Sequence, residues 1–149
     1  MKNIDWKLGL GEGGIFIGAQ DRLNSTIPVR AILTASEYFC DLLYINRVNI
    51  SIVKGNDVSV RFNRMLGAEE CGNENGMLRM FFTREMLHER SDALRAGIAK
   101  RYGEQQSTIK LTPESTAELE LLSRRIELNK SRVLKPLRKE KLLWSYTCQ

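Results

Sequence analysis

The stretch STIKLTPES, residues 107–115, lies between two segments with helical periodicity. Its first residues alternate polar and apolar side chains, which is typical of a short β-strand with one polar face. Thr112, Pro113 and Glu114 then supply an N-cap, a residue suited to the first helical position and an acid near the positive end of a helix. A lone strand needs a pairing partner, and we expect the same strand of a second chain to provide it.

Two helices are predicted after this strand. Leu119, Leu122 and Ile126 form an apolar stripe at helical spacing, and Asn129 can cap a second helix. Neither helix can bury its apolar side alone, so the sequence predicts a two-fold dimer in which the strands pair antiparallel and the helices interlock. The expected dimer core consists of Ile109, Leu111, Leu119, Leu122, Ile126, Val133, Leu134 and Leu137.

The order strand, helix, turn, helix over about residues 106–146 resembles the MetJ/Arc-type ribbon-helix-helix superfamily of DNA-binding proteins. The resemblance is carried by TIKL at 108–111, the Thr112 cap and LNKS at 128–131. It implies a ribbon that enters the major groove, where base edges can be read. The implied base-reading residues are Gln106, Thr108 and Lys110, and the implied phosphate-binding residues are Asn129, Lys130, Ser131 and Arg132.

The positive charge of the chain is concentrated at one end. The 149 residues carry a formal net charge of +5. From Arg124 onward there are eight basic and two acidic residues, a net charge of +6, whereas the rest carries 15 basic and 16 acidic residues. This asymmetry favours an anionic partner, with nucleic acid first and a solvated helical face as the alternative.

The first hundred residues are predicted to be rich in β-structure. Strands are expected at 13–20, 27–33 and 38–45, a hairpin at 48–62 and a polar loop at 67–76. A helix is expected from the cap Thr83 to about Tyr102. The predicted class is therefore α+β, with a β-rich domain over 1–103 and a ribbon-helix-helix domain over 106–149.

The sequence gives little indication of catalysis. Gly9, Gly11 and Gly14 match G-x-G-x-x-G, but the downstream segment is predicted as strand rather than helix, so dinucleotide binding is not expected. The single histidine, His88, is expected at the surface. The three cysteines are widely spaced, which is typical of reduced thiols. We expect no enzyme activity, catalytic residue, metal or cofactor, and the absence of a signal peptide or membrane span predicts a cytoplasmic protein.

The function predicted from the sequence is sequence-specific binding of double-stranded DNA by a homodimer or higher homo-oligomer, as a transcriptional repressor. A relaxosome or partition accessory protein of a plasmid or mobile element, or an antitoxin, is an alternative with the same module. A second alternative is an adaptor or inhibitor that binds no DNA. Residues 1–103 could bind a ligand or a protein partner.

Overall fold

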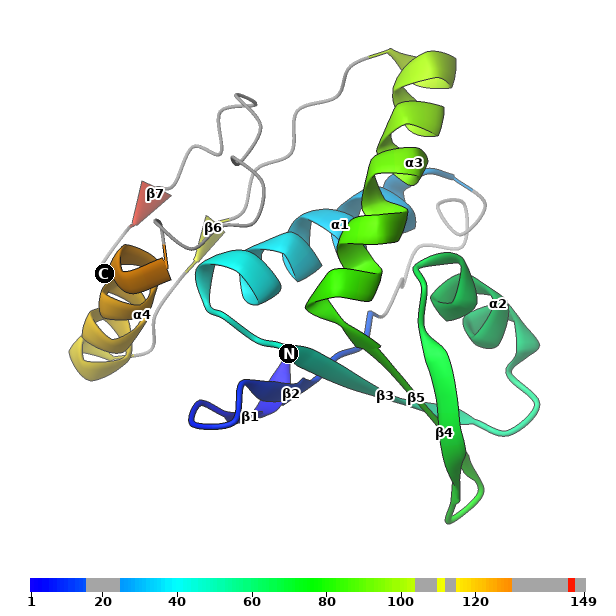
Figure 1. Cartoon of the computed structure of the whole chain (residues 1–149), viewed down its shortest axis with the longest axis horizontal. Helices are drawn as coiled ribbons and strands as arrows, with labels where there is room; N and C mark the ends of the chain where they lie inside the picture. The colour runs from blue at the N-terminus through cyan, green and yellow to red at the C-terminus, as the bar shows by residue number, and fades with distance from the viewer. Residues whose placement is uncertain (16–24, 104–109, 112–114, 130–144, 147–149) are drawn as a thin grey trace.

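The computed structural model describes residues 1–15, 25–103, 110–111, 115–129 and 145–146. It has an α+β fold in which helices pack on a mixed five-stranded sheet (Figure 1). The strand order is β1-β2-β3-β5-β4. The strands of this sheet are β1 (Lys2–Asp5), β2 (Leu10–Glu12), β3 (Arg47–Val53), β4 (Glu69–Glu74) and β5 (Met77–Thr83).

Four α-helices and one π-helical turn lie within the described residues. None of these helices has the length and apolar content that a bilayer crossing requires. The helical elements are α1 (Ile27–Glu37), η2 (Tyr38–Leu42), α2 (Asp57–Met65), α3 (Arg84–Tyr102) and α4 (Thr116–Asn129).

The central strand β3 joins the two halves of the sheet. It pairs in parallel with β2 on one side and antiparallel with β5 on the other. Its side chains alternate, so that Val48, Ile50 and Ile52 are buried under the helices while Ser51 and Val53 are exposed on the opposite face. The core therefore lies on one face of the sheet, with Leu33, Leu43, Ile45, Met80, Phe82 and Leu87 among its most buried members.

Two segments predicted as strands are helical. Residues 27–33 belong to α1 and residues 38–45 contain η2. Pro28 stands at the start of α1, where its missing N–H has no intrahelical partner to lose. Val29 and Leu33 are four residues apart, so the same apolar run that reads as a buried strand also fits one face of a helix.

The predicted hairpin at 48–62 is also wrong. Its first half is β3, but its second half is α2, which begins because the Asn56 side chain accepts a hydrogen bond from the Ser59 N–H at 3.1 Å. The predicted loop at 67–76 contains β4 instead. Asn75 and Gly76, both with positive φ, make a two-residue turn into β5.

The expected helix after Thr83 is confirmed as α3. The Thr83 hydroxyl accepts a hydrogen bond from the Met86 N–H at 3.3 Å, and the helix ends at Gly103, whose φ is +77°. Glycine adopts that conformation without the strain that a side chain adds.

The C-terminal helix α4 packs against the rest of the same chain. Leu122 and Ile126 are 9% and 7% exposed and join the single core. Arg125 donates to the backbone oxygens of Trp6 and Leu43 at 2.6 and 3.2 Å, and Asn129 donates to that of Leu42 at 3.2 Å. The predicted division into domains at 103–106 stays a prediction, because residues 104–109 lie outside those described.

We expect Ile126→Ala to lower the free energy of unfolding by about 2–4 kcal/mol, because it leaves a cavity between α4 and the core. Leu128→Ala on the same helix is the matched control, since Leu128 is 70% exposed and its loss should cost less than about 0.5 kcal/mol. Urea denaturation of the full chain measures both. Equal effects of the two substitutions would contradict the packing of α4 on the core.

Candidate functional site

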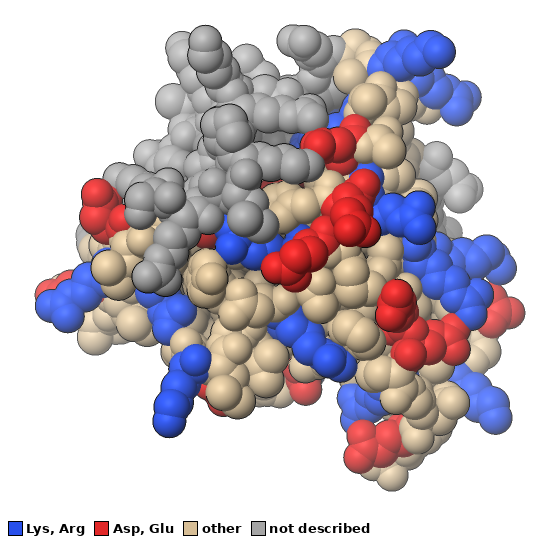
Figure 2. Space-filling view, in the orientation of Figure 1, with Lys and Arg blue, Asp and Glu red and all other residues tan. Residues whose placement is uncertain are grey.

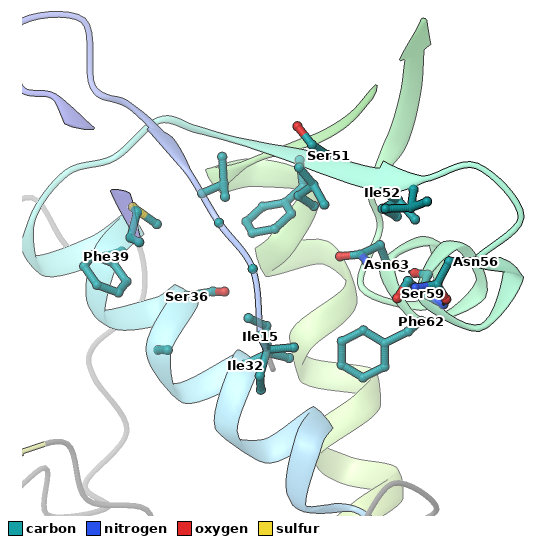
Figure 3. A pocket seen from close by; sticks show the side chains of 18 residues that line it. Ile15, Ile32, Ser36, Phe39, Ser51, Ile52, Asn56, Ser59, Phe62 and Asn63 are labelled. Carbon is teal, nitrogen blue, oxygen red and sulfur yellow. Dashed lines mark hydrogen bonds between the residues drawn. The ribbon is translucent and has the colours of Figure 1, made fainter. Parts of the chain in front are cut away.

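One cavity lies where β2 and β3 part. The two strands pair from Leu10 opposite Arg47 to Glu12 opposite Asn49. The last bond between them runs from the Gly13 N–H to the Asn49 carbonyl oxygen, at 2.9 Å. Beyond it β3 continues to Val53, whereas Ile15 lies on the α1 side of the opening (Figure 3). A cavity of about 260 Å³ occupies the opening.

Two helices and β3 form the walls of this cleft. Figure 3 shows Ile32, Ser36 and Phe39 from the α1 side facing Ser59, Phe62 and Asn63 of α2. Val48, Ile50 and Ile52 of β3 and Phe82 of β5 complete an apolar lining. Among the described residues that line the cleft there is no aspartate, glutamate, lysine, arginine, histidine or cysteine side chain.

A glycine is required at the point where the strands part. A Cβ atom on Gly13 would lie 2.5 Å from Cγ1 of Val48, much closer than carbon atoms approach. Any side chain at position 13 would therefore push β2 away from β3 or displace the buried Val48. Gly14, by contrast, has open space around its Cα, so the restriction is local to position 13.

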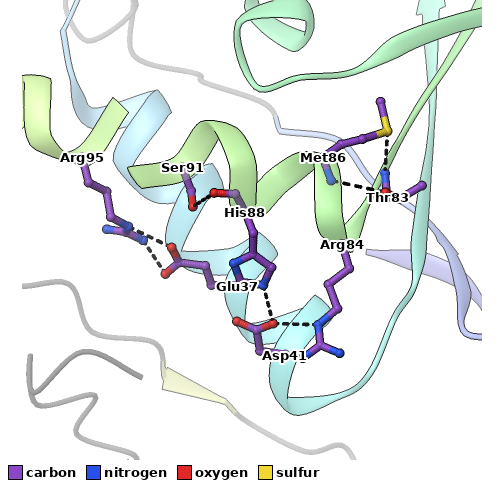
Figure 4. A network of polar contacts seen from close by, with 8 residues as sticks. All are labelled: Glu37, Asp41, Thr83, Arg84, Met86, His88, Ser91 and Arg95. Carbon is purple, nitrogen blue, oxygen red and sulfur yellow. Dashed lines mark hydrogen bonds and ion pairs between the residues drawn. The ribbon is translucent and has the colours of Figure 1, made fainter. Parts of the chain in front are cut away.

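A buried charge cluster holds α3 against the α1–η2 wall. Asp41 and Arg84 are each 3% exposed, and His88 is 8% exposed. Arg84 Nε donates to Asp41 Oδ1 at 2.9 Å, and His88 Nε2 lies 2.8 Å from the same oxygen (Figure 4). Since an ionised carboxylate only accepts hydrogen bonds, the proton of this contact is on Nε2. His88, expected at the surface, is instead a core residue.

A second ion pair extends the same interface. Glu37 at the end of α1 receives two hydrogen bonds from Arg95 of α3, at 2.8 and 2.5 Å. These side chains are about one-fifth exposed, so water screens them more than it screens the Asp41 cluster.

Burial, with a smaller contribution from Asp41, raises the pKa of the neighbouring Cys40 thiol to about 12.

The described residues include only part of the predicted DNA-binding site. Lys110 and Leu111 form β6, which pairs in parallel with Ser145 and Tyr146 of β7. Asn129 is buried against Leu42, and Leu119 is half-buried on α4. The remaining predicted residues lie outside the described ranges, and no finding tests their individual roles. They are Gln106, Thr108, Ile109, Lys130, Ser131, Arg132, Val133, Leu134 and Leu137.

The basic C-terminal stretch does not form a continuous surface in the described residues. Arg125 is half-buried and holds backbone oxygens, and its guanidinium lies 4.4 Å from the centre of the Trp6 ring. On the face shown in Figure 2, acidic side chains lie beside basic ones over the described part of the molecule. Six of the eight C-terminal basic residues lie outside the described ranges.

The cleft was not predicted from the sequence, because the glycines before it and the cap of α2 were interpreted as other features. Gly9, Gly11 and Gly14 match a dinucleotide fingerprint, and that match does not include Gly13. A glycine pair directly after a short strand is also a signal for close backbone approach. The hairpin predicted at 48–62 turns at Gly55, Asn56 and Asp57, although Asn56, three residues before Ser59, is also a good helix cap.

Comparisons with known proteins give one finding of similarity. No family model matches the chain, and no curated protein matches it. A solved structure described as "Apo FdhC- a nucleotide-linked sugar GNAT" is similar over 47% of this chain, with 18% identity and a TM-score of 0.44. The similar part spans 39% of that structure, and at this TM-score it assigns neither family nor activity to the chain.

The ribbon-helix-helix interpretation is wrong. No family model matches the chain, and the similar structure is described as a GNAT and not as a DNA-binding protein. Within the described residues, β6 pairs in parallel with a strand of its own chain, whereas a ribbon needs antiparallel pairing with a second copy. α4 also buries its stripe in the core of the chain. The sequence-specific DNA-binding, repressor and mobile-element functions are withdrawn with it, as is the expectation that the chain is not an enzyme.

We expect Asp41→Asn to lower the free energy of unfolding by about 3–5 kcal/mol, because the buried Arg84 guanidinium then loses the negative charge of Asp41. Glu37→Gln, in the more exposed pair of the same interface, should cost about 1 kcal/mol or less. Urea denaturation at neutral pH compares the two variants. An Asp41→Asn loss no larger than that of Glu37→Gln would contradict the importance of the buried cluster.

Alkylation should distinguish the two described cysteines. Cys40 is fully buried and its pKa is raised, so little of it is thiolate, which is the reactive form. Cys71 is exposed on β4. With iodoacetamide at about pH 8 we expect labelling of Cys71 and not of Cys40 in the folded protein, and labelling of both after denaturation. Peptide mass spectrometry measures this, and fast labelling of folded Cys40 would contradict its burial.

Proposed function

We propose that this chain binds the extended arm of an acyl thioester in the cleft between β2 and β3, as part of an acyl-transfer reaction. The observation that carries the proposal is the parting of two parallel strands at Gly13, which leaves one side of β3 facing a cavity rather than a neighbouring described strand.

The backbone of β3 offers a row of hydrogen-bonding groups to this cavity. The Asn49 carbonyl oxygen faces β2, because it accepts from Gly13. Backbone groups alternate along a strand, so those of Ser51 and Val53 face the same side, beyond the last β2 bond. An extended ligand with amide groups can pair with such a strand as another strand does.

The lining favours a slender ligand without charge in this segment. Most of the wall is apolar, with the polar side chains of Ser36, Asn56 and Asn63 at a few positions. Sites of this kind bury a ligand through apolar contact and orient it through a few hydrogen bonds. The pantetheine arm of coenzyme A has this character, being a thin aliphatic chain interrupted by amides.

Because no ionisable side chain occurs among the described lining residues, we expect the bound ligand to supply the reactive group. The serine hydroxyls of the lining have no histidine or carboxylate beside them among the described lining residues that could activate them as nucleophiles. The ligand must bring the reactive group itself, as a cofactor does. A thioester meets this requirement, since its acyl carbon is already activated for attack by an acceptor molecule.

Isothermal titration of the full chain with coenzyme A and acetyl-coenzyme A tests the proposal. We expect Ser36→Phe, which puts an aromatic ring into the cleft, to weaken binding at least about tenfold. Val58→Phe is the control, because Val58 is 70% exposed on α2 and does not line the cleft. Adenosine 3′,5′-bisphosphate, which lacks the arm, should bind more weakly than coenzyme A and be insensitive to Ser36→Phe.

Two outcomes would overturn the proposed function. One is the absence of coenzyme A binding to the unmodified chain. The other is equal weakening by Ser36→Phe and Val58→Phe, which would place the ligand somewhere other than the cleft.

A further inference from the structure

Helix α2 separates the cleft from a second cavity. This second cavity, of about 420 Å³, lies between α2, β4 and the turn that follows β3 (Figure 1). The side chains of α2 divide between the two cavities. Those on the cleft side are Ser59, Phe62 and Asn63, and those on the other side are Asp57, Val60, Arg61 and Arg64. Residues three or four apart share one side of a helix, so each cavity faces its own side of α2.

The packing of α2 is looser than that of the other helices. Among the α-helices in the described ranges, α2 alone has no buried residue. It is fixed mainly at its ends, by the Asn56 cap before it and by Leu66 after it, which is 1% exposed. An element with few buried contacts shifts or opens at a low cost in free energy. A ligand beside α2 can therefore change how firmly the helix is held.

Basic side chains outnumber acidic ones around the second cavity. Three basic residues, Lys54, Arg61 and Arg64, line it together with two acidic residues, Asp57 and Glu70. Arg64 and Glu70 form an ion pair with each other. Within the described part of the chain, no ion pair engages Lys54 or Arg61. The second cavity therefore has two cationic side chains that no ion pair neutralises.

Apolar side chains complete the lining of the second cavity. They are Val53, Val60 and Leu78. Val60 and Leu78 are half-buried and pack against the core. The volume of about 420 Å³ falls within the range of small-molecule sites, about 300–1,000 Å³. The second cavity thus offers a ligand apolar contact together with positive charge.

We propose that the second cavity is an effector site for a small organic anion with an apolar body, and that its occupant orders α2 and strengthens binding in the cleft. The effect on the cleft rests on the proposed function, whereas the anion site does not. Lys54 and Arg61 bind the anionic group, and the apolar side chains contact the body of the ligand. A neutral ligand gains only the apolar contact, and a cation is repelled by both side chains. Asp57 opposes an anion weakly, because it lies in the first turn of α2, where the helix dipole offsets its charge.

The occupant acts on the cleft through α2. When the second cavity is filled, α2 is held from the side opposite the cleft and loses conformational freedom. A ligand that then enters the cleft has less ordering of Phe62 and Asn63 left to impose, so it binds more tightly. Linkage requires the reverse effect to be equal, so the cleft ligand strengthens anion binding by the same factor.

Three probes with one ring system test the anion site. Isothermal titration of the full chain compares naphthoate, naphthyl phosphate and the neutral alcohol naphthalenemethanol. We expect both anions to bind at least about tenfold more tightly than the alcohol. The preference should decrease as salt is added, because salt screens exposed cations. Hydrogen exchange followed by mass spectrometry should show slower exchange across residues 57–65 with naphthoate bound.

Variants assign the anion preference to residues. Lys54→Met and Arg61→Met each remove a charge while keeping most of the apolar stem, and together they should abolish the preference. Asp57→Asn should tighten binding of both anions, a gain that a loss of folding cannot produce. Arg90→Met is the matched control, because Arg90 is exposed on α3 and lines neither cavity. Ser36→Phe, which fills the cleft, should leave naphthoate binding in place.

The effect on the cleft is measured by titrating coenzyme A with and without saturating naphthoate. We expect naphthoate to tighten coenzyme A binding at least about threefold, and the variant lacking both Lys54 and Arg61 charges to lose this gain. Unchanged coenzyme A affinity, together with unchanged exchange in α2, would overturn the effector role.

The anion site and the proposed function fail on different results. Equal binding of the three probes, or an anion preference that survives loss of both charges, would overturn the anion site while leaving the thioester cleft standing. An intact anion preference without any coenzyme A binding would overturn the proposed function and the effector role, and would leave the anion site standing.

Discussion

The close approach of β2 and β3 at Gly13 is the constraint on which the other features of the site depend. Only a residue without a side chain lets the Gly13 N–H reach the Asn49 carbonyl oxygen while Val48 stays buried beneath it. Among the described residues, β2 and β3 pair up to Gly13, and the part of β3 from Ser51 to Val53 has no described strand on that side. The cleft on the helix side is a consequence of that parting.

The sequence predicted α+β correctly and placed α3 between Thr83 and Gly103, because a cap, an apolar stripe and a terminal glycine all agree there. It failed for α1 and η2, since a short run of branched apolar residues satisfies either a buried strand or a buried helix. Tertiary contacts decide whether such an apolar run forms a strand or a helix. Leu33 and Leu42 are buried by elements that no local pattern identifies.

The C-terminal helix shows a different limit of sequence reasoning. The apolar stripe of α4 was recognised correctly, but a stripe does not specify the surface that covers it. The covering surface is the N-terminal part of the same chain, where Arg125 and Asn129 reach backbone oxygens of Trp6, Leu43 and Leu42. Those oxygens accept hydrogen bonds from side chains far along the chain. Such contacts follow no sequence periodicity, so the sequence pattern does not predict them. The cleft was beyond prediction for the same reason, because it needs the register of β2 against β3.

The Asp41 cluster has a consequence for the geometry of the cleft wall. Apolar contacts between helices resist separation but allow small rotations and slides, because one methyl group can replace another. A carboxylate oxygen that must receive hydrogen bonds from Arg84 and His88 together permits one rotation of α3 relative to η2. Since η2 continues directly from α1, the cluster also fixes the orientation of the α1 wall. The width of the opening opposite β3 is therefore set by these charged hydrogen bonds as well as by apolar packing.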